Sequence, residues 1–189
     1  DAFRGLSGSG LVTNYGTGNM SIRPQAGERF VFSGTVHATN DGVGASWVME
    51  GSSTVGTQVF ETTLPFQQNL QILNGVGVLA GANGASAAAT NVINIGRNDG
   101  STALAGTNAT LLLDSSGANH ATQDRLNDGT VINLRTSGEL AMIGNDSADT
   151  TEDVGTIAVS AHNEGRGHVM VTVDAGANAG AQLISDSLN

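Results

Sequence analysis

The chain is a succession of short apolar runs separated by small polar residues. Within the runs, apolar and polar side chains alternate, as in RFVFSGTVHA (29–38), TQVFETT (57–63) and HVMVTVD (168–174). An alternation with a period of two places successive side chains on opposite faces of a β-strand. Gly, Asn, Asp or Ser occupies almost every interval between runs, and these residues favour turns. The pattern predicts an all-β chain of many short strands.

The expected strands share this alternation, and each ends at such a turn. They are residues 10–14, 19–24, 29–38, 46–50, 57–63, 70–73, 76–80, 91–96, 109–114, 130–135, 139–144, 155–160, 168–174 and 181–185. The alanine-rich segment 82–91 has no apolar stripe at helical spacing, so we expect a loop there with at most one helical turn. No Pro- or Ser-rich linker divides the chain, so we expect one domain over residues 1–189, or one segment of a larger repetitive protein.

Two architectures accommodate these strands. A β-sandwich or jelly roll needs strands every ~8–12 residues and usually a few large aromatic side chains in its core. A parallel β-helix (β-solenoid) needs short strands, Gly, Asn and Asp corners, and small or β-branched residues in a narrow interior. Aromatic residues make up only 4% of the chain, which favours the solenoid. With ~20–25 residues per coil it would have about eight coils and two open ends that need a cap or another chain.

One long stretch carries a recognisable order of strands and turns. Residues 109–173 run from the strand LLLDSSG through an Asn-rich turn, DRLND, the Gly-bracketed strand SGELAMIGN and a turn ending in TEDVG to the strand TIAVS. Near the start, GSGLVTNYGTGNMSI (8–22) places Gly-x-Gly before a strand. Both segments resemble the passenger segments of large bacterial, planctomycete-type surface proteins with autotransporter-associated β-strand repeats.

This resemblance implies a β-helical, secreted or cell-surface protein with a structural role. It brings over no catalytic or binding residue, since the shared motifs describe the geometry of coils. The segment 37–66 departs from the family's pattern through its wide strand spacing and the only tryptophan, Trp47. We expect a side loop, an edge strand or a lateral contact there.

Composition removes several classes of function. The formal net charge is −10, and all seven basic residues are arginines. Such a chain repels nucleic acid and anionic membranes, and it has no lysine for Schiff-base or lysine acid–base chemistry. It also has no cysteine, which excludes disulfides and thiolate metal sites. No apolar run approaches the ~18 residues of a membrane helix, so we expect no membrane insertion.

The interval between the apolar runs 139–144 and 155–160 is the richest in possible metal ligands. It contains the four carboxylates of Asp146, Asp149, Glu152 and Asp153, and Ca²⁺ prefers several oxygen ligands. A calcium site is therefore considered, although the interval matches neither the EF-hand loop nor the nonapeptide calcium repeat. The favoured interpretation is a solvated turn without a cofactor, whose Ser, Thr and Asp side chains bond to their own backbone.

The best candidate for acid–base catalysis is the cluster of Asp124 and Asp128 with His120 and Arg125 nearby. Glycoside cleavage needs two carboxyl groups ~5–9.5 Å apart across a cleft, one of them with a pKa raised by burial. An Asn/Asp/Gln-rich turn works against that, because solvent stabilises the charged form. Only His162 and His168 are close enough in sequence to suggest zinc, and they follow no protease motif. We therefore predict that the protein is not an enzyme.

The function favoured by these patterns is structural. We predict a secreted or cell-surface bacterial protein that assembles with copies of itself, through strand edges or coil ends, into a filament, sheath or surface array. The residues expected to take part are those of the first and last strands together with the tryptophan: Leu11, Val12, Met20, Ile22, Trp47, Leu183 and Ile184. A polysaccharide-binding or adhesive module is the alternative, and a β-helical polysaccharide lyase or hydrolase is less favoured.

Overall fold

The structure is a computed structural model of the chain, and it describes residues 2–14, 18–38, 46–50, 56–64, 69–86, 92–97, 108–117, 120, 124–160 and 169–189. The strands are β1 (Ala2–Phe3), β2 (Leu11–Asn14), β3 (Met20–Ile22), β4 (Arg29–Phe32), β5 (Thr35–Ala38), β6 (Trp47–Met49), β7 (Thr57–Phe60), β8 (Thr63–Leu64), β9 (Leu70–Ile72), β10 (Gly75–Ala80), β11 (Ala85–Ser86), β12 (Val92–Ile95), β13 (Ala109–Asp114), β14 (Val131–Leu134), β15 (Gly138–Ile143), β16 (Thr150–Val159), β17 (Met170–Asp174) and β18 (Ala181–Leu188). Within these ranges the protein is all-β and has no helix that is long and apolar enough to cross a membrane.

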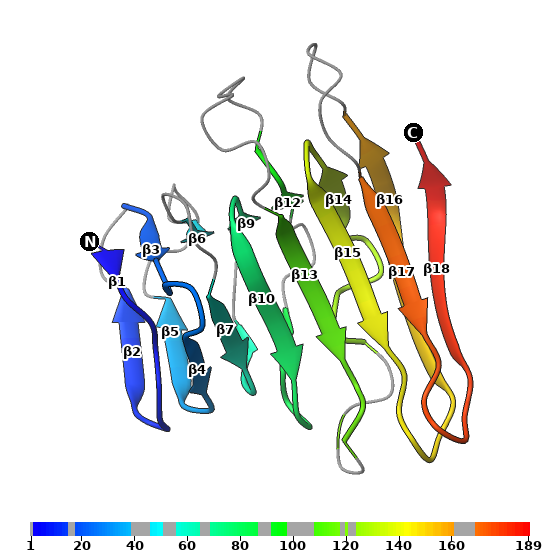
Figure 1. The fold of residues 1–189 in the computed structure, drawn as a ribbon, viewed down its shortest axis with the longest axis horizontal. Helices are drawn as coiled ribbons and strands as arrows, with labels where there is room; N and C mark the ends of the chain where they lie inside the picture. The colour runs from blue at the N-terminus through cyan, green and yellow to red at the C-terminus, as the bar shows by residue number, and fades with distance from the viewer. Residues whose placement is uncertain are drawn as a thin grey trace.

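The strands form two large sheets and two small ones, none of which closes on itself. The larger sheet has eight strands in the order β1-β3-β6-β9-β12-β14-β16-β18, and the second has six in the order β17-β15-β13-β10-β7-β4. Strands β2 and β5 form one small sheet, and β8 and β11 form the other. The strands follow one another along the long axis, so the two termini lie at opposite ends of the molecule (Figure 1).

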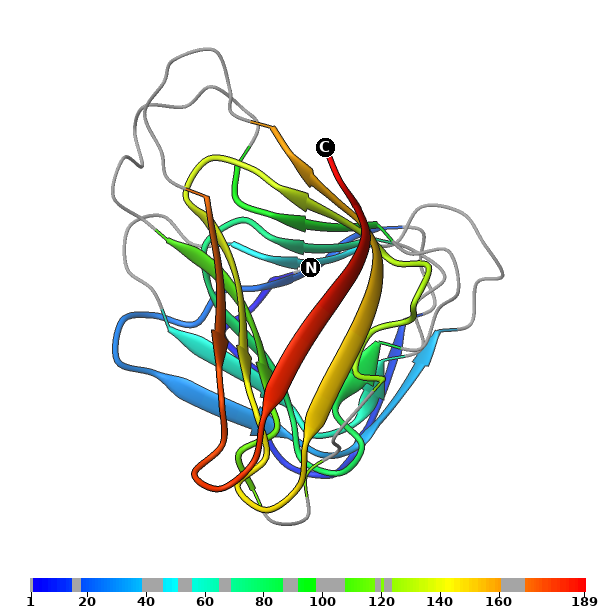
Figure 2. The same ribbon diagram turned by 90° about the vertical axis from the view of Figure 1, so that its right-hand side faces the viewer.

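All pairings between these strands are parallel. The chain visits the eight-stranded sheet, then the six-stranded sheet and then a third side, before it returns to the eight-stranded sheet. We call the third side the group made of β2, β5, β8, β11, residues 124–126 and the first halves of β16 and β18. Seen along the long axis, the sheets surround a common interior (Figure 2). Sandwiches and jelly rolls are built from antiparallel sheets, so the alternative prediction of that architecture does not fit these strands.

Register partners stack their side chains into rows that run along the long axis. Because side chains alternate between faces, every second residue of a strand joins an inward-facing row. Two such rows on the eight-stranded sheet are Met20, Trp47, Leu70, Ile93, Ile132, Ile157 and Leu188, and Phe3, Ile22, Met49, Ile72, Ile95, Leu134 and Val159. On the six-stranded sheet one row is Gly8, Phe32, Phe60, Leu79, Leu113, Met142 and Val173.

These rows make one hydrophobic core that extends from Met20 to Ile157. The members in the middle of the rows are almost completely shielded, and Ile93 and Ile132 have no exposed surface. Trp47 and Phe60 meet edge to face across the interior, with ring centroids 5.8 Å apart and planes at 86°. This geometry is favourable for aromatic pairs, and it holds the two large sheets together near one end of the core.

Several strand boundaries differ from those expected from the sequence. The expected strand at 29–38 is divided into β4 and β5 at Ser33–Gly34, because the chain turns there from the six-stranded sheet to the third side. The segment 82–91, expected to be a loop, includes β11, which pairs with β8, while residues 87–91 lie outside the described ranges. Strand β16 begins at Thr150, inside the acidic interval that was expected to be a turn.

The stacked core makes a prediction about stability. Replacing Ile132 by Ala removes buried methyl groups from a row that neighbouring side chains fill completely, and should cost about 2–5 kcal/mol of the free energy of unfolding. Ile184→Ala is the matched control, because Ile184 is 41% exposed, and it should cost less than about 1 kcal/mol. Chemical denaturation of dilute protein measures both values. Equal losses at the two positions would contradict the stacked core.

Candidate functional site

The first half of the acidic interval ties together two successive turns. Asn145 begins the turn after β15, and its Oδ1 accepts hydrogen bonds from the N–H and the hydroxyl of Ser147, both at 2.9 Å. The carboxylate of Asp146 accepts the N–H of Ala177 at 3.1 Å, and that of Asp149 accepts the N–H of Gly180 at 2.8 Å. These two acids therefore bond backbone groups of the next turn, which precedes β18.

The second half of the interval is a strand that places two neighbouring acids on opposite faces. Asp153 is exposed, whereas Glu152 faces the interior and is only 2% exposed. The Glu152 carboxylate accepts the backbone N–H of Arg125 at 2.9 Å and that of Leu126 at 2.7 Å. Leu183 of β18 is its register partner. Glu152 thus supplies the acceptors that residues 125 and 126 would otherwise find in a neighbouring strand.

Burial sets the protonation of this carboxylate. The loss of solvent raises the pKa of Glu152 from its ordinary value of 4.5 to about 7. The two N–H donors from Leu126 and Arg125 lower the pKa, but they do not offset the desolvation. The charge of Asp124 raises it further, and that of Arg125 lowers it slightly.

Arg125 is the largest buried side chain of the third side, at 1% exposure. Its guanidinium donates to the carbonyl oxygens of Gly84 (2.6 Å), Asp114 (2.7 Å) and Gly81 (3.0 Å), and its Nε–H donates to the hydroxyl of Ser115 (3.0 Å). Desolvation lowers the pKa of this guanidinium, and the charges of Asp114 and Glu152 partly restore it. A rigid fork of donors is well matched to several carbonyl oxygens at once, so Arg125 joins the turn at residues 81–84 to the turn at residues 114–115.

The four carboxylates proposed for calcium do not converge. Asp146 and Asp149 are bonded to the turn before β18, Glu152 is buried against residues 125 and 126, and Asp153 faces solvent on the other side of the strand. The described residues contain no group of three or more His, Asp or Glu side chains that could hold a metal ion. Three of the four carboxylates of the acidic interval instead bond to backbone N–H groups.

The proposed acid–base cluster is also dispersed. Asp124 and Asp128 are exposed, while Arg125 between them turns into the core. Asp124, just before Arg125, has a left-handed backbone conformation (φ 58°), which few residues other than glycine adopt. The ring nitrogen Nδ1 of His120 lies 3.0 Å from the carbonyl oxygen of Asp114. His162 and His168 lie outside the described residues.

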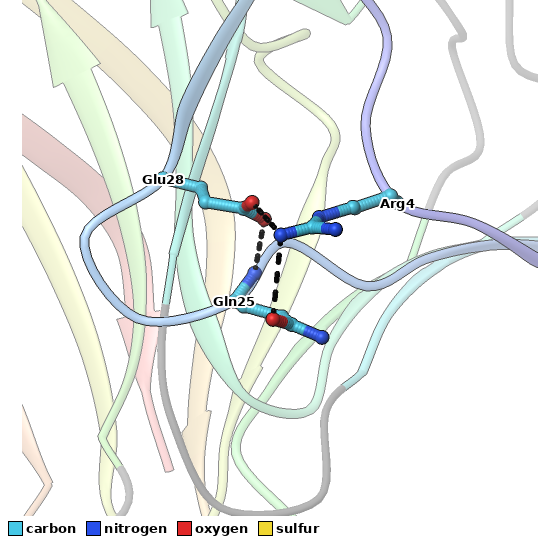
Figure 3. A network of polar contacts seen from close by, with 3 residues as sticks. All are labelled: Arg4, Gln25 and Glu28. Carbon is cyan, nitrogen blue, oxygen red and sulfur yellow. Dashed lines mark hydrogen bonds and ion pairs between the residues drawn. The ribbon is translucent and has the colours of Figure 1, made fainter.

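Open edges at both ends of the molecule are the other candidate site. At the N-terminal end, β1 and β2 are edge strands, and the segment around Gly8 pairs with β4 through the bonds of Gly8 N–H to Val31 and Ser33 N–H to Gly8. Arg4 of this first segment contacts the carboxylate of Glu28 and the side-chain oxygen of Gln25 (Figure 3). Inside, the buried Gln58 exchanges two hydrogen bonds with the backbone of Leu6, at 2.8 and 3.0 Å.

At the C-terminal end, inward-facing apolar side chains are uncovered. Val171 and Val173 of β17 continue the rows of Leu140 and Met142, yet they are 45% and 39% exposed. Leu188 of β18 continues the row of Ile157 and is 72% exposed. These residues have the correct orientation for a core, but no strand of the described ranges lies over them. We call β17, β18 and these three side chains the C-terminal end surface.

The structure places the residues predicted for self-assembly in three kinds of position. Leu11 is 66% exposed and Val12 is partly buried, both on the edge strand β2. Leu183 and Ile184 lie on the edge strand β18. The other three residues, Met20, Ile22 and Trp47, do not lie on an open edge, which corrects the prediction. Strands β3 and β6 are interior strands, and these side chains are 1–7% exposed in the core. The side chain of Trp47 therefore packs in the core and does not form the contact surface that was expected around it.

The comparisons with known proteins leave these surfaces without an assigned role. No family model matches the chain, and no curated protein or solved structure matches it significantly.

Sequence reasoning anticipated open ends, but it missed the buried polar residues of the third side and the exposed inward-facing residues Val171, Val173 and Leu188. One signal was available, because Thr150, Glu152 and Val154 alternate in step with the inward positions of a strand, which assigns Glu152 to the interior. Nothing in the sequence distinguished Arg125 from the exposed arginines. The exposure of Val171 and Val173 follows only from the order of the strands in the sheet.

The buried Glu152 predicts a pH-dependent stability. Because its pKa is higher in the folded chain, the folded state binds the proton more tightly, and protonation favours folding. This contribution is complete below pH ~4.5 and is lost as the pH rises through about 7, with a total of roughly 3 kcal/mol. Urea denaturation across this pH range should show the loss in the wild type and not in Glu152→Gln. The control Asp153→Asn, at the exposed neighbour, should behave as the wild type does.

The guanidinium of Arg125 predicts a cost for even a conservative change. Arg125→Lys keeps the charge but cannot reach four acceptors, which leaves buried carbonyl oxygens without donors and should cost at least about 2 kcal/mol of the free energy of unfolding. The control Arg29→Lys changes an exposed arginine and should alter it by less than about 0.5 kcal/mol. If both variants unfold at the wild-type denaturant concentration, Arg125 does not hold these two turns together.

Proposed function

We propose that the chain is a parallel β-solenoid whose function is structural, and that it assembles with copies of itself through its open ends. The rotation of the chain among three sides, the parallel pairing and the inward rows all support the solenoid. In such a stack each coil covers the one before it, and the last coil remains uncovered until another molecule binds. The polymer would be a filament, sheath or surface array.

The observation that carries this proposal is the C-terminal end surface. Val171, Val173 and Leu188 have the orientation of core residues and the exposure of surface residues. Beside them, the edge strands β17 and β18 offer backbone N–H and C=O groups to a further strand. An edge that is both apolar and unpaired is energetically costly in water, and pairing with another chain removes both costs.

The buried polar residues support a structural role over catalysis. The most unusual carboxylate, Glu152, is bonded to backbone N–H groups, is paired with Leu183 of β18 and is only 2% exposed. The exposed acids Asp146 and Asp149 are bonded to the neighbouring turn. The carboxylates that could serve an enzyme therefore bond to the backbone at the corners of the proposed stack.

The location proposed is the bacterial exterior, secreted or at the cell surface. It rests on the resemblance of residues 109–173 to autotransporter-associated β-strand repeats, and a chain without cysteine suits an oxidising environment. With its acidic charge, the protein would take neither nucleic acid nor anionic membrane as a partner.

Association of the purified protein tests this function. Sedimentation velocity and electron microscopy should show polymers whose amount increases with concentration. The double variant Val171→Gln with Val173→Gln should weaken association at least about a hundredfold, because each buried valine contributes ~1.5–3 kcal/mol. Polar side chains at these exposed positions should leave the monomer folded.

Met170→Gln is the matched control for that variant. Met170 lies on the same strand and is 51% exposed, but it belongs to the outward-facing set and would stay in solvent in a stack. The Met170→Gln variant should therefore polymerise as the wild type does. A wild type that stays monomeric at every concentration would refute the proposed function, and equal effects of the two substitutions would refute the end surface as its site.

A further inference from the structure

The two ends of the molecule differ in charge. Residues 1–38, which form β1 to β5, contain three arginines and two acids, for a net charge of +1. Residues 139–189, which form β15 to β18, contain one arginine and eight acids, for a net charge of −7. Opposite ends of this kind attract one another, whereas two C-terminal ends repel.

The ends also share the same rows. Phe3, at 39% exposure, begins an inward row of the eight-stranded sheet, and Val159, at 41% exposure, finishes it. On the six-stranded sheet, one row begins at Gly8 and finishes at Val173. If a second molecule stacked in the same direction, the first residue of each row in one copy would follow the last residue of the same row in the other copy. The hydrophobic row would then continue from one copy to the next.

The direction of the strands favours the same arrangement. Every pairing between named strands is parallel, including those of the last strands β17 and β18. A copy added in the same orientation can continue a parallel ladder with β1 and the Gly8 segment. A copy related by a two-fold axis would bring β18 against another β18 in the antiparallel direction, and would place acid against acid.

We infer that the partner of the C-terminal end surface is the N-terminal end of a second copy, bound head to tail; this inference rests on the proposed function. On the third side, β2 of the incoming copy adds in parallel along the first half of β18, which brings Leu11 and Val12 beside the segment that contains Leu183 and Ile184. A head-to-tail contact uses two different surfaces and does not close, so it generates an open filament rather than a dimer.

Mixing two end-blocked variants tests this polarity. The head-blocked variant carries Phe3→Gln and Leu11→Gln, and the tail-blocked variant carries Val171→Gln and Val173→Gln. These neutral changes lie at exposed positions and leave the charge pattern unchanged. In sedimentation velocity, each variant alone should be monomeric, and an equimolar mixture should form a dimer that does not grow. Raising the ionic strength should dissociate this dimer, because the attraction between the ends is screened.

Two outcomes would overturn the inference. If the head-blocked variant dimerises alone, its intact tail binds another tail, and the contact is two-fold while the proposed function still holds. If the mixture stays monomeric under conditions in which the wild type forms filaments, the two ends are not partners. A wild type without any polymer would instead refute both the proposed function and the inference that rests on it. Circular dichroism confirms that each variant is folded.

Discussion

The burial of each strand by the next one along the axis is the constraint on which the rest of the structure depends. A strand such as β12 has only four residues and cannot form a core with its neighbours in sequence, so it relies on β9 and β14 on either side. Its inward residues Ile93 and Ile95 are fully buried because both of these neighbours are present. The same dependence explains why Val171 and Val173, with a neighbour on only one side, remain exposed.

The third side meets this constraint by different means. At residues 124–126 no strand forms, and side chains replace the missing backbone hydrogen bonds. The Glu152 carboxylate accepts hydrogen bonds from two N–H groups, and the Arg125 side chain donates four hydrogen bonds to neighbouring turns. Buried charges of this type cost desolvation energy, but removing one partner leaves the other uncompensated. Glu152 and Arg125 therefore depend on these partners, and they close the corner beside β16, the strand on which β18 pairs.

The alternation of apolar residues was sufficient to predict an all-β chain and most of its strands, because it depends on local geometry that the sequence carries directly. It could not place the strands in sheets, since the partners of β13 are β10 and β15, which come from distant parts of the chain. For that reason Met20, Ile22 and Trp47 were expected at a contact and lie in the core. The acidic interval was expected to be a turn throughout, because its four carboxylates outweighed the alternation of Thr150, Glu152 and Val154, and because the sequence does not reveal that β18 covers the first half of β16.

Near both ends of the molecule, charged side chains connect successive turns of the chain. Within the chain, two acids near the C-terminal end bond to the next turn: Asp146 accepts the N–H of Ala177, and Asp149 accepts that of Gly180. At the N-terminal end, Arg4 acts in the same way on the following segment, through Glu28 and Gln25. Since the same chain joins each coil to the next by both apolar rows and polar corners, an interface between copies that reproduces those contacts needs no new kind of interaction. In the proposed assembly, the polarity of the charges along the axis would favour contact between unlike ends.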